Sequence, residues 1–166
     1  LNVEDLSPQQ FAALNPRQLS ALTEEQASNI SGEQFARLSA SQLSGLQAKV
    51  IKELEVGVLA TLAANSAKGL KPEHIAEMSG SQIKELPNHA LTVLSSTQLV
   101  SLDVSEMEVS QISALQPKQI MSLKPEQIQS MDASLLAEFS LAQVQGMKPA
   151  QIAVLSEAQL QALGLN

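Results

Sequence analysis

Large aliphatic residues recur at every eighth position along most of this chain. The first series runs from Leu6 to Leu102 without a slip, and a second runs from Leu115 to Leu163. A further apolar residue stands three positions before most members, as Phe11 stands before Leu14. The members are Leu6, Leu14, Leu22, Ile30, Leu38, Leu46, Leu54, Leu62, Leu70, Met78, Leu86, Leu94, Leu102, Leu115, Leu123, Met131, Phe139, Met147, Leu155 and Leu163. The chain is therefore a tandem array of octapeptides.

The polar positions of each octad form a helix-start signal. With the aliphatic residue as position eight, position one commonly holds an N-cap residue: Ser7, Asn15, Thr23, Ser31, Ser39, Ser79, Ser95, Asp103, Asp132, Ser140 and Ser156. Position two often holds proline, which suits a first helical residue: Pro8, Pro16, Pro72, Pro117, Pro125 and Pro149. Each well-formed octad is predicted to begin its own helix.

Position four is the preferred place of glutamine, where the side chain can reach back to the N-cap backbone in a capping box. These residues are Gln10, Gln18, Gln26, Gln34, Gln42, Gln82, Gln98, Gln119, Gln127, Gln143, Gln151 and Gln159. Since the unit contains a cap, a first-turn proline and a reach-back residue, it specifies where each helix starts.

Two other architectures conflict with this pattern. In one continuous helix an eight-residue period would advance by about 800°, so the apolar stripe would drift by about 80° per unit. The prolines would each break the hydrogen-bond ladder. In a strand, apolar residues spaced three and five apart would fall on both faces. The sequence thus predicts an all-α superhelix, or α-solenoid, of short helices with positions five and eight facing a common axis. Two or three helices per superhelical turn are both compatible with it.

The octad signal weakens first between Gln47 and Ala64, where caps, prolines and glutamines vanish. Apolar residues recur there at every fourth position, at Leu46, Val50, Leu54, Val58 and Leu62. This spacing predicts one longer amphipathic helix over 47–64. Gly69 is then expected to supply a left-handed C-cap.

The second break lies between Leu102 and Leu115, which are thirteen residues apart and enclose an irregular corner at 103–115. One interpretation is that this segment is a tolerated insertion in the superhelix. The other is that it is an acidic corner that changes the direction of the superhelix axis or contacts a partner. We expect a single unit over 1–166, with sub-arrays at 1–46, 71–102 and 116–163.

Composition restricts the classes of partner. The formal charge of −7 and the scattered Lys and Arg residues argue against nucleic acid and anionic membranes. With no Cys, Trp or Tyr, the composition excludes thiolate zinc sites, disulfides and aromatic base-stacking platforms. No apolar run approaches the roughly 18 residues of a membrane span. The sequence therefore predicts neither a nucleic-acid partner nor membrane insertion.

Candidate catalytic or metal-binding chemistry is sparse. His74 and His89 are the only histidines, and His74 occupies the position where the octad normally has glutamine, so a capping or surface role is favoured. Three pairs of carboxylates lie close together in the sequence: Glu24 with Glu25, Glu73 with Glu77, and Glu106 with Glu108. None of them has the loop pattern of a calcium site. No phosphate-binding loop or nucleophile elbow is present. We predict no catalytic, metal-binding or cofactor-binding residues, no cofactor and no enzymatic activity.

The octads resemble those of two groups of proteins. Segments 14–22 and 155–163 are similar to the tandem L-T-x-x-Q-[VI]-A-A-L tracts of very large bacterial exported proteins. Segments 123–128 and 147–152 look like the L-S-P-E-x-L octads of the mesothelin, stereocilin and otoancorin group. A likeness to the L-T-P-E-Q-V opening of TAL-effector repeats fails, because those units are longer and have a basic inner face.

What the resemblance implies is display or adhesion outside the cell. The expected function is thus a non-enzymatic structural or binding module of a surface or secreted adhesin-like protein, acting as a rigid spacer or a protein- or glycan-binding surface. The alternative is an intracellular protein-interaction scaffold, such as a segment of a bacterial effector. No binding residue is implied, because the shared positions are core residues and caps.

Overall fold

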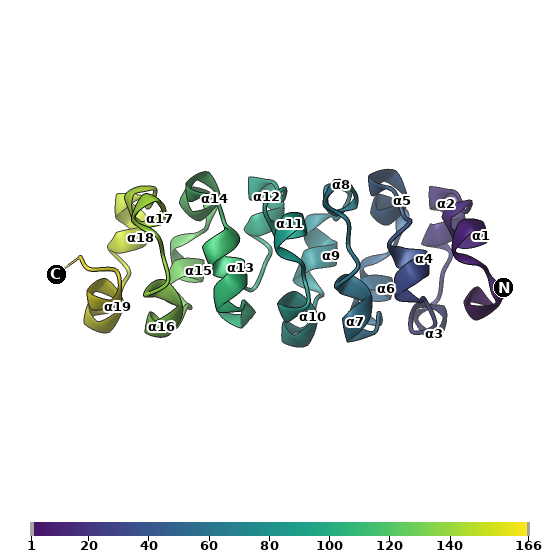
Figure 1. Cartoon of the computed structure of the whole chain (residues 1–166), viewed down its shortest axis with the longest axis horizontal. Coiled ribbons are helices and arrows are strands. Elements are labelled where there is room, and N and C mark those ends of the chain that lie inside the picture. Colours follow the sequence, from purple (N-terminus) through teal and green to yellow (C-terminus); the bar gives the residue numbers. More distant parts are fainter. Residues whose placement is uncertain (1, 166) are drawn as a thin grey trace.

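The chain forms a rod of short helices, with its two termini at opposite ends of the long axis (Figure 1). A computed structural model describes residues 2–165; Leu1 and Asn166, the outermost positions of the predicted unit, lie outside them. The described residues form nineteen α-helices and two 3₁₀-helices, with no strand among them, and no α-helix exceeds six residues. The predicted all-α superhelix of short helices is confirmed.

Three helices make one superhelical turn. The packing contacts join each element to the third one along the chain, so the elements stack in three columns. The first column holds η1 (Val3–Asp5), α3 (Glu24–Ala27), α6 (Ala48–Lys52), α9 (Pro72–Ala76), α12 (Ser96–Leu99), α14 (Pro117–Ser122) and α17 (Leu141–Gln145).

The other two columns complete the rod. The second holds α1 (Pro8–Ala12), α4 (Gly32–Phe35), α7 (Val56–Leu59), α10 (Gly80–Lys84), η2 (Val104–Glu106), α15 (Pro125–Gln129) and α18 (Pro149–Ile152). The third holds α2 (Pro16–Ser20), α5 (Ala40–Gly45), α8 (Ala64–Ala67), α11 (Asn88–Leu91), α13 (Val109–Ala114), α16 (Ala133–Leu136) and α19 (Glu157–Ala162). The columns wind around the axis, because the third begins at the top of Figure 1 with α2 and ends at the bottom with α19.

The core lies along the axis of the rod and is built from octad positions five and eight, as predicted. Ile120 and Leu123, at these two positions of one octad, are 0% and 3% exposed. A single apolar cluster runs from Val3 in the first turn to Leu163 in the last. Because no helix here is long enough to be stable alone, this shared core must supply most of the stabilisation.

The helix starts follow the predicted chemistry. All six position-two prolines stand at the first turn of a helix. Reciprocal capping boxes join position one to position four in nine helices, as in Ser79 and Gln82 of α10. Asp132 is an exception, since its side chain makes no cap hydrogen bond. The residue that precedes a helix is extended in nearly every case, as Ser79 is before α10, and it carries the chain into the next column.

The long helix predicted over 47–64 is wrong. This segment contains α6 and α7 and reaches the start of α8, so the octad array continues through it. Val50 and Val58 occupy position four, where other octads have glutamine, and they created the apparent four-residue period. The octad residues Leu54 and Leu62 remain buried at the breaks between these helices.

Gly69 has a different role from the predicted left-handed C-cap. Of the described residues, only Gly164 has a positive φ, at 69°. A Cβ on Gly69 would lie 1.9 Å from the carbonyl oxygen of Ala40 in the helix one turn earlier. Gly69 is thus required for the close approach of two stacked backbones.

The irregular corner at 103–115 is a shortened repeat followed by a regular one. The 3₁₀-helix η2 takes the place of an α-helix, and α13 follows it. Leu102 and Met107, on either side of η2, are both buried, as position-eight residues are elsewhere. The element η2 packs between α10 and α15 in the second column, so the three-per-turn path is unbroken.

Candidate interaction surface

The position-four glutamines have a second use that links successive turns of the rod. The Oε1 atom of Gln119 accepts the N–H of Gln116 at 3.0 Å, closing the local helix start. Its Nε2 atom donates to the carbonyl oxygens of Leu91 and Leu94, at 2.9 and 3.2 Å, one turn earlier. Since Gln119 is only 3% exposed, these bonds satisfy buried backbone groups at a corner of the chain.

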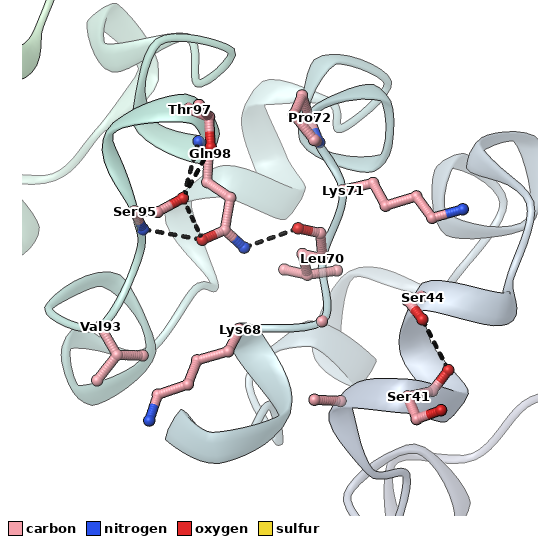
Figure 2. A pocket seen from close by; sticks show the side chains of 12 residues that line it. Ser41, Ser44, Lys68, Leu70, Lys71, Pro72, Val93, Ser95, Thr97 and Gln98 are labelled. Atoms are coloured by element: carbon pink, nitrogen blue, oxygen red, sulfur yellow. Dashed lines mark hydrogen bonds between the residues drawn. The ribbon is translucent and has the colours of Figure 1, made fainter.

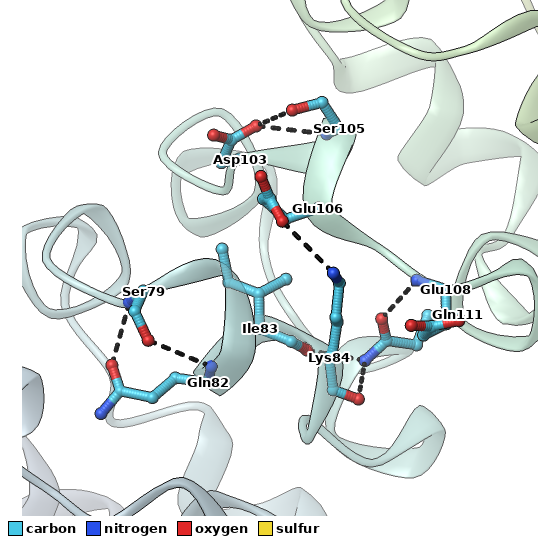
Figure 3. A network of polar contacts seen from close by, with 9 residues as sticks. All are labelled: Ser79, Gln82, Ile83, Lys84, Asp103, Ser105, Glu106, Glu108 and Gln111. Atoms are coloured by element: carbon cyan, nitrogen blue, oxygen red, sulfur yellow. Dashed lines mark hydrogen bonds and ion pairs between the residues drawn. The ribbon is translucent and has the colours of Figure 1, made fainter.

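Ten glutamines make this connection to a carbonyl within residues 2–165, and we call them the glutamine ladder. Figure 3 shows Gln111 beside Lys84 of the preceding turn, where its Nε2 donates to the carbonyl oxygens of Ile83 and Lys84. The members are Gln34, Gln42, Gln82, Gln98, Gln111, Gln119, Gln127, Gln143, Gln151 and Gln159. The ladder fixes the register of each turn on the turn before it, except for the turn of α6, α7 and α8, which has no ladder glutamine.

His74 replaces a ladder glutamine, which confirms its predicted capping role. Its Nδ1 accepts the N–H of Lys71 at 3.1 Å, and its Nε2 lies 2.9 Å from the carbonyl oxygen of Leu46, to which it must donate. The ring is 1% exposed, and burial, as the largest cause, lowers the pKa of His74 below 6.5. Both nitrogens are engaged, so this imidazole is a structural group.

His89 makes a similar bond from position three of its octad. Its Nε2 lies 2.9 Å from the carbonyl oxygen of Leu62, one turn earlier. Position four of the same octad is Ala90, which has no polar group to offer. The structure therefore uses both histidines to contact backbone carbonyls, and each lies at a different corner.

The carboxylate pairs singled out in the sequence do not converge. Glu24 pairs with Lys49 at 3.6 Å, Glu77 with Lys52 at 4.0 Å, and Glu106 with Lys84 at 3.5 Å. Each of these ion pairs joins neighbouring turns at the surface, and Figure 3 shows the third. Exposed pairs of this kind contribute about 0–1 kcal/mol each.

The described residues contain no group of three or more His, Asp or Glu side chains placed to hold a metal ion. Nor does any helix within 2–165 combine the length and the apolarity that crossing a bilayer requires.

Shallow grooves run along the corners where the chain passes between columns. The groove in Figure 2 lies between α5, the corner joining α8 to α9, and α12. Gln98 donates across it to the carbonyl oxygen of Leu70 at 2.7 Å, while the Lys68 and Lys71 side chains extend along its rim. Such an open groove suits an extended segment or a loop of a partner better than an enclosed small molecule.

Two large apolar side chains are exposed on the first column near the C-terminal end. Leu141, at the start of α17, is 73% exposed, and Met121 on the stacked helix α14 is 43% exposed. Lys118 and Lys148 lie beside Met121 at a shared groove. We call these four residues the 118–148 surface; it combines apolar contacts with positive charge on an otherwise acidic rod.

The methionines divide between core and surface. Met78, Met131 and Met147, at position eight, are buried, as expected of core residues. Met121 is instead at position six and exposed. Sequence reasoning missed the 118–148 surface, although leucine at position two, where octads often have proline or a small residue, was a usable signal at Leu141.

Comparison with known proteins adds no relative. No family model matches the chain, and no curated protein matches it.

Proposed function

We propose that this chain is a non-enzymatic structural and binding module of a surface or secreted adhesin-like protein. In this role it acts as a rigid spacer whose lateral surface contacts a protein or glycan. The observation that carries the proposal is the continuous turn-to-turn stacking, in which ladder glutamines from Gln34 to Gln159 link every turn except that of α6, α7 and α8 to the turn before it. A rod connected in this way separates whatever is attached at its two ends.

Rigidity follows from the arrangement of contacts. Each turn contacts only its neighbours. Core burial is joined by side-chain hydrogen bonds to backbone carbonyls of the turn before, from ladder glutamines in most turns and from Thr61 and Ser66 in the turn of α6, α7 and α8. Bending the rod would stretch the buried bonds on one side, such as the 2.8 Å contact from Gln151 to Leu123. The polar acidic exterior keeps a long apolar core in solution.

The 118–148 surface supports the binding half of the proposal. Exposed Leu141 and Met121 offer apolar contacts, while Lys118 and Lys148 offer charge to an acidic group of a protein or glycan. Neither lysine has an ion-pair partner among residues 2–165, so both are available to a partner.

Antibody labelling of cells that make the natural protein tests the location. Antibodies against the folded chain should bind intact cells, and mild external protease should remove the epitope. The control is a cytosolic marker that labels only after permeabilisation. If this chain behaved like that marker, the intracellular interaction scaffold would replace the adhesin-like spacer as its function.

A further inference from the structure

Two shallow grooves adjoin on one side of the rod. The groove in Figure 2 is lined by Ser95, the residue before α12, and Ser95 also lines the groove beside Met121 of α14. Both residues are exposed. We call the two adjoining grooves the corner groove; the lining residues used below are Lys68, Lys71, Val93, Ser95, Lys118 and Met121. The corner groove passes over three successive turns, those of α9, α12 and α14.

Positive charge collects along the corner groove, although the chain as a whole has a formal charge of −7. Lys68 and Lys71 border its first part, while Lys118 and Lys148 border its second part. Figure 2 shows the Lys68 and Lys71 side chains extending in opposite directions from the corner that joins α8 to α9. Among the described residues that line the corner groove, none is Asp or Glu. An acidic ligand therefore meets positive charge at both ends and no negative charge in the lining.

The lysines of the corner groove are also less neutralised than others on the rod. Lys84 pairs with a glutamate of the next turn at 3.5 Å, whereas Lys68 and Lys118 have no ion-pair partner among the described residues. Lys71 makes one long pair with Glu73, at 3.9 Å, and both of these side chains are about half exposed. Since such a pair contributes about 0–1 kcal/mol, Lys71 remains able to bind a carboxylate of another chain.

Apolar side chains lie between the lysines. Val93 in the first part of the corner groove is half-buried, and Met121 in the second part is 43% exposed. Both belong to turns that have another turn packed on each side, so this exposure is a property of the lateral surface. Methionine adapts its shape to different apolar groups. The corner groove thus combines apolar contacts with flanking positive charge.

This lining favours a peptide over a carbohydrate. The only aromatic residues of the chain are Phe11, Phe35 and Phe139, and none of them lines the corner groove. A sugar ring would therefore find no large flat aromatic surface on which to pack. Aliphatic side chains such as Val93 and Met121 instead suit the alternating side chains of an extended peptide.

The spacing of the lysines indicates the length of the ligand. Lys71 precedes α9, and Lys118 lies in α14, two turns further along the same column. Stacked helices lie about 8–10 Å apart, so two turns cover about 16–20 Å. An extended peptide advances about 3.3 Å per residue and needs about five or six residues to cover that distance. Acidic groups with this separation would contact both lysines at once.

We propose that the corner groove binds an extended acidic peptide segment of a partner protein, with carboxylates about five residues apart and apolar side chains between them. This inference rests on the proposed function as a binding module and names the chemistry of its partner. The carboxylates at one end of the peptide contact Lys68 and Lys71, and those at the other end contact Lys118. The side chains between them pack on Val93 and Met121.

Fluorescence anisotropy of a labelled synthetic peptide, titrated with the purified chain, tests this proposal. The probe has Glu-Glu at each end and about five uncharged residues, valine and leucine among them, in between. Wild type should bind it at low salt with a dissociation constant below about 1 mM. Lys68→Glu and Lys118→Glu each place a carboxylate against one end of the probe. Each should therefore raise the dissociation constant at least about tenfold.

Arg37→Glu supplies the matched control. Arg37 is exposed, has no ion-pair partner among the described residues and does not line the corner groove. Its reversal changes the net charge by the same amount and should leave binding unchanged. A second probe, with both glutamate pairs at one end, should bind less tightly than the first. Circular dichroism of each variant checks that it stays helical.

Three results would overturn the proposal. The first is a probe that stays unbound at about 1 mM protein, and the second is equal weakening by Arg37→Glu and the lysine reversals. The third is an oligogalacturonate that binds as tightly as the peptide or more tightly, which would assign the corner groove to an acidic glycan. None of these results bears on the cell-surface labelling that tests the proposed location, so the two failures are distinguishable.

Discussion

Residues 47–70 and the octads that flank them follow the same three-per-turn path with different polar residues. The octad before this segment has a serine cap and a ladder glutamine, Ser39 and Gln42, while the octad after it has His74 in the glutamine position. In 47–70, position four holds Val50, Val58 and Ser66, and α6, α7 and α8 have no side-chain cap bond. The aliphatic residues at positions five and eight are the feature that all these octads share.

This difference separates the interactions that are needed for the three-per-turn path from those that only stabilise it. Ser66 donates to the carbonyl oxygen of Leu38 at 2.5 Å, and Thr61 donates to that of Gly32 at 3.1 Å. These shorter side chains each satisfy one corner carbonyl, where a ladder glutamine satisfies two or three. The stacked core is thus sufficient for the bend, while the ladder and caps add stability to it.

The largest expected effect comes from charging the axis in either region. Leu123→Asp in a regular octad and Leu54→Asp in 47–70 each bury a carboxylate without a partner, and each should cost about 3–5 kcal/mol. Urea unfolding followed by circular dichroism measures the loss. Lys118→Asp, on the exposed face, should stay within about 0.5 kcal/mol of wild type. A small loss of stability in the Leu54→Asp variant would mean that residues 47–70 do not share the axial core.

The next effect concerns two glycines within the segment. Gly69→Ala forces a methyl group against the Ala40 carbonyl oxygen and should destabilise by about 1–3 kcal/mol. Gly57→Ala, in α7, meets no atom within 4 Å and should stabilise by about 0.5–1 kcal/mol, because alanine favours helix. Thermal unfolding of the two variants should therefore move in opposite directions. Equal shifts would contradict the close approach of α8 to α5.

Removing or adding a glutamine at octad position four should have a smaller effect. Gln119→Leu removes the donor to Leu91 and Leu94 and the acceptor for the Gln116 N–H, at a cost of about 1–2 kcal/mol. Leu135→Gln introduces glutamine at a position four that lacks it, and it should be neutral or slightly stabilising. Denaturant midpoints at constant m-value provide the comparison. A Gln119→Leu variant as stable as wild type would show that the glutamine ladder does not contribute to the stability of the fold.

His74 gives the smallest expected effect, and it depends on pH. Burial lowers the pKa of His74 below 6.5, so the unfolded chain binds its proton more readily than the folded chain. Its contribution is fully present above pH 6.5 and is lost as pH falls through the lower folded value. Wild type should therefore lose stability relative to His74→Gln between pH 7.5 and 5.5, as measured by urea unfolding at each pH. Parallel pH profiles would show that His74 is not buried as described.

Much of this fold could be predicted from single octads. A cap, a proline and a glutamine act within one helix start, so these residues predicted where nearly every helix begins. The three-residue spacing between positions five and eight predicted the core. The number of helices per turn is set by packing between residues about 28 apart in sequence, as for Gln119 and Leu91, and no single octad contains that information.

The errors have physical causes that particular residues make plain. Val50 and Val58 completed a four-residue period, which favours a continuous helix, while the breaks at Leu54 and Leu62 depend on stacking against other turns. The ladder was missed because a capping box explains glutamine locally. Its persistence at Gln119 and Gln127, where Gln116 and Lys124 replace the serine cap, was the available sign of a second role.

An engineered disulfide tests the continuous stack most directly, since the natural sequence has no cysteine. A Cβ at Gly32 would lie 4.0 Å from the Cβ of Thr61 one turn later, which is suitable for a disulfide. Gly32→Cys combined with Thr61→Cys should oxidise rapidly within one chain, whereas Gly32→Cys with Gly57→Cys should not. A Gly32–Thr61 pair that stays reduced under the same conditions would contradict the passage of the superhelix through 47–70.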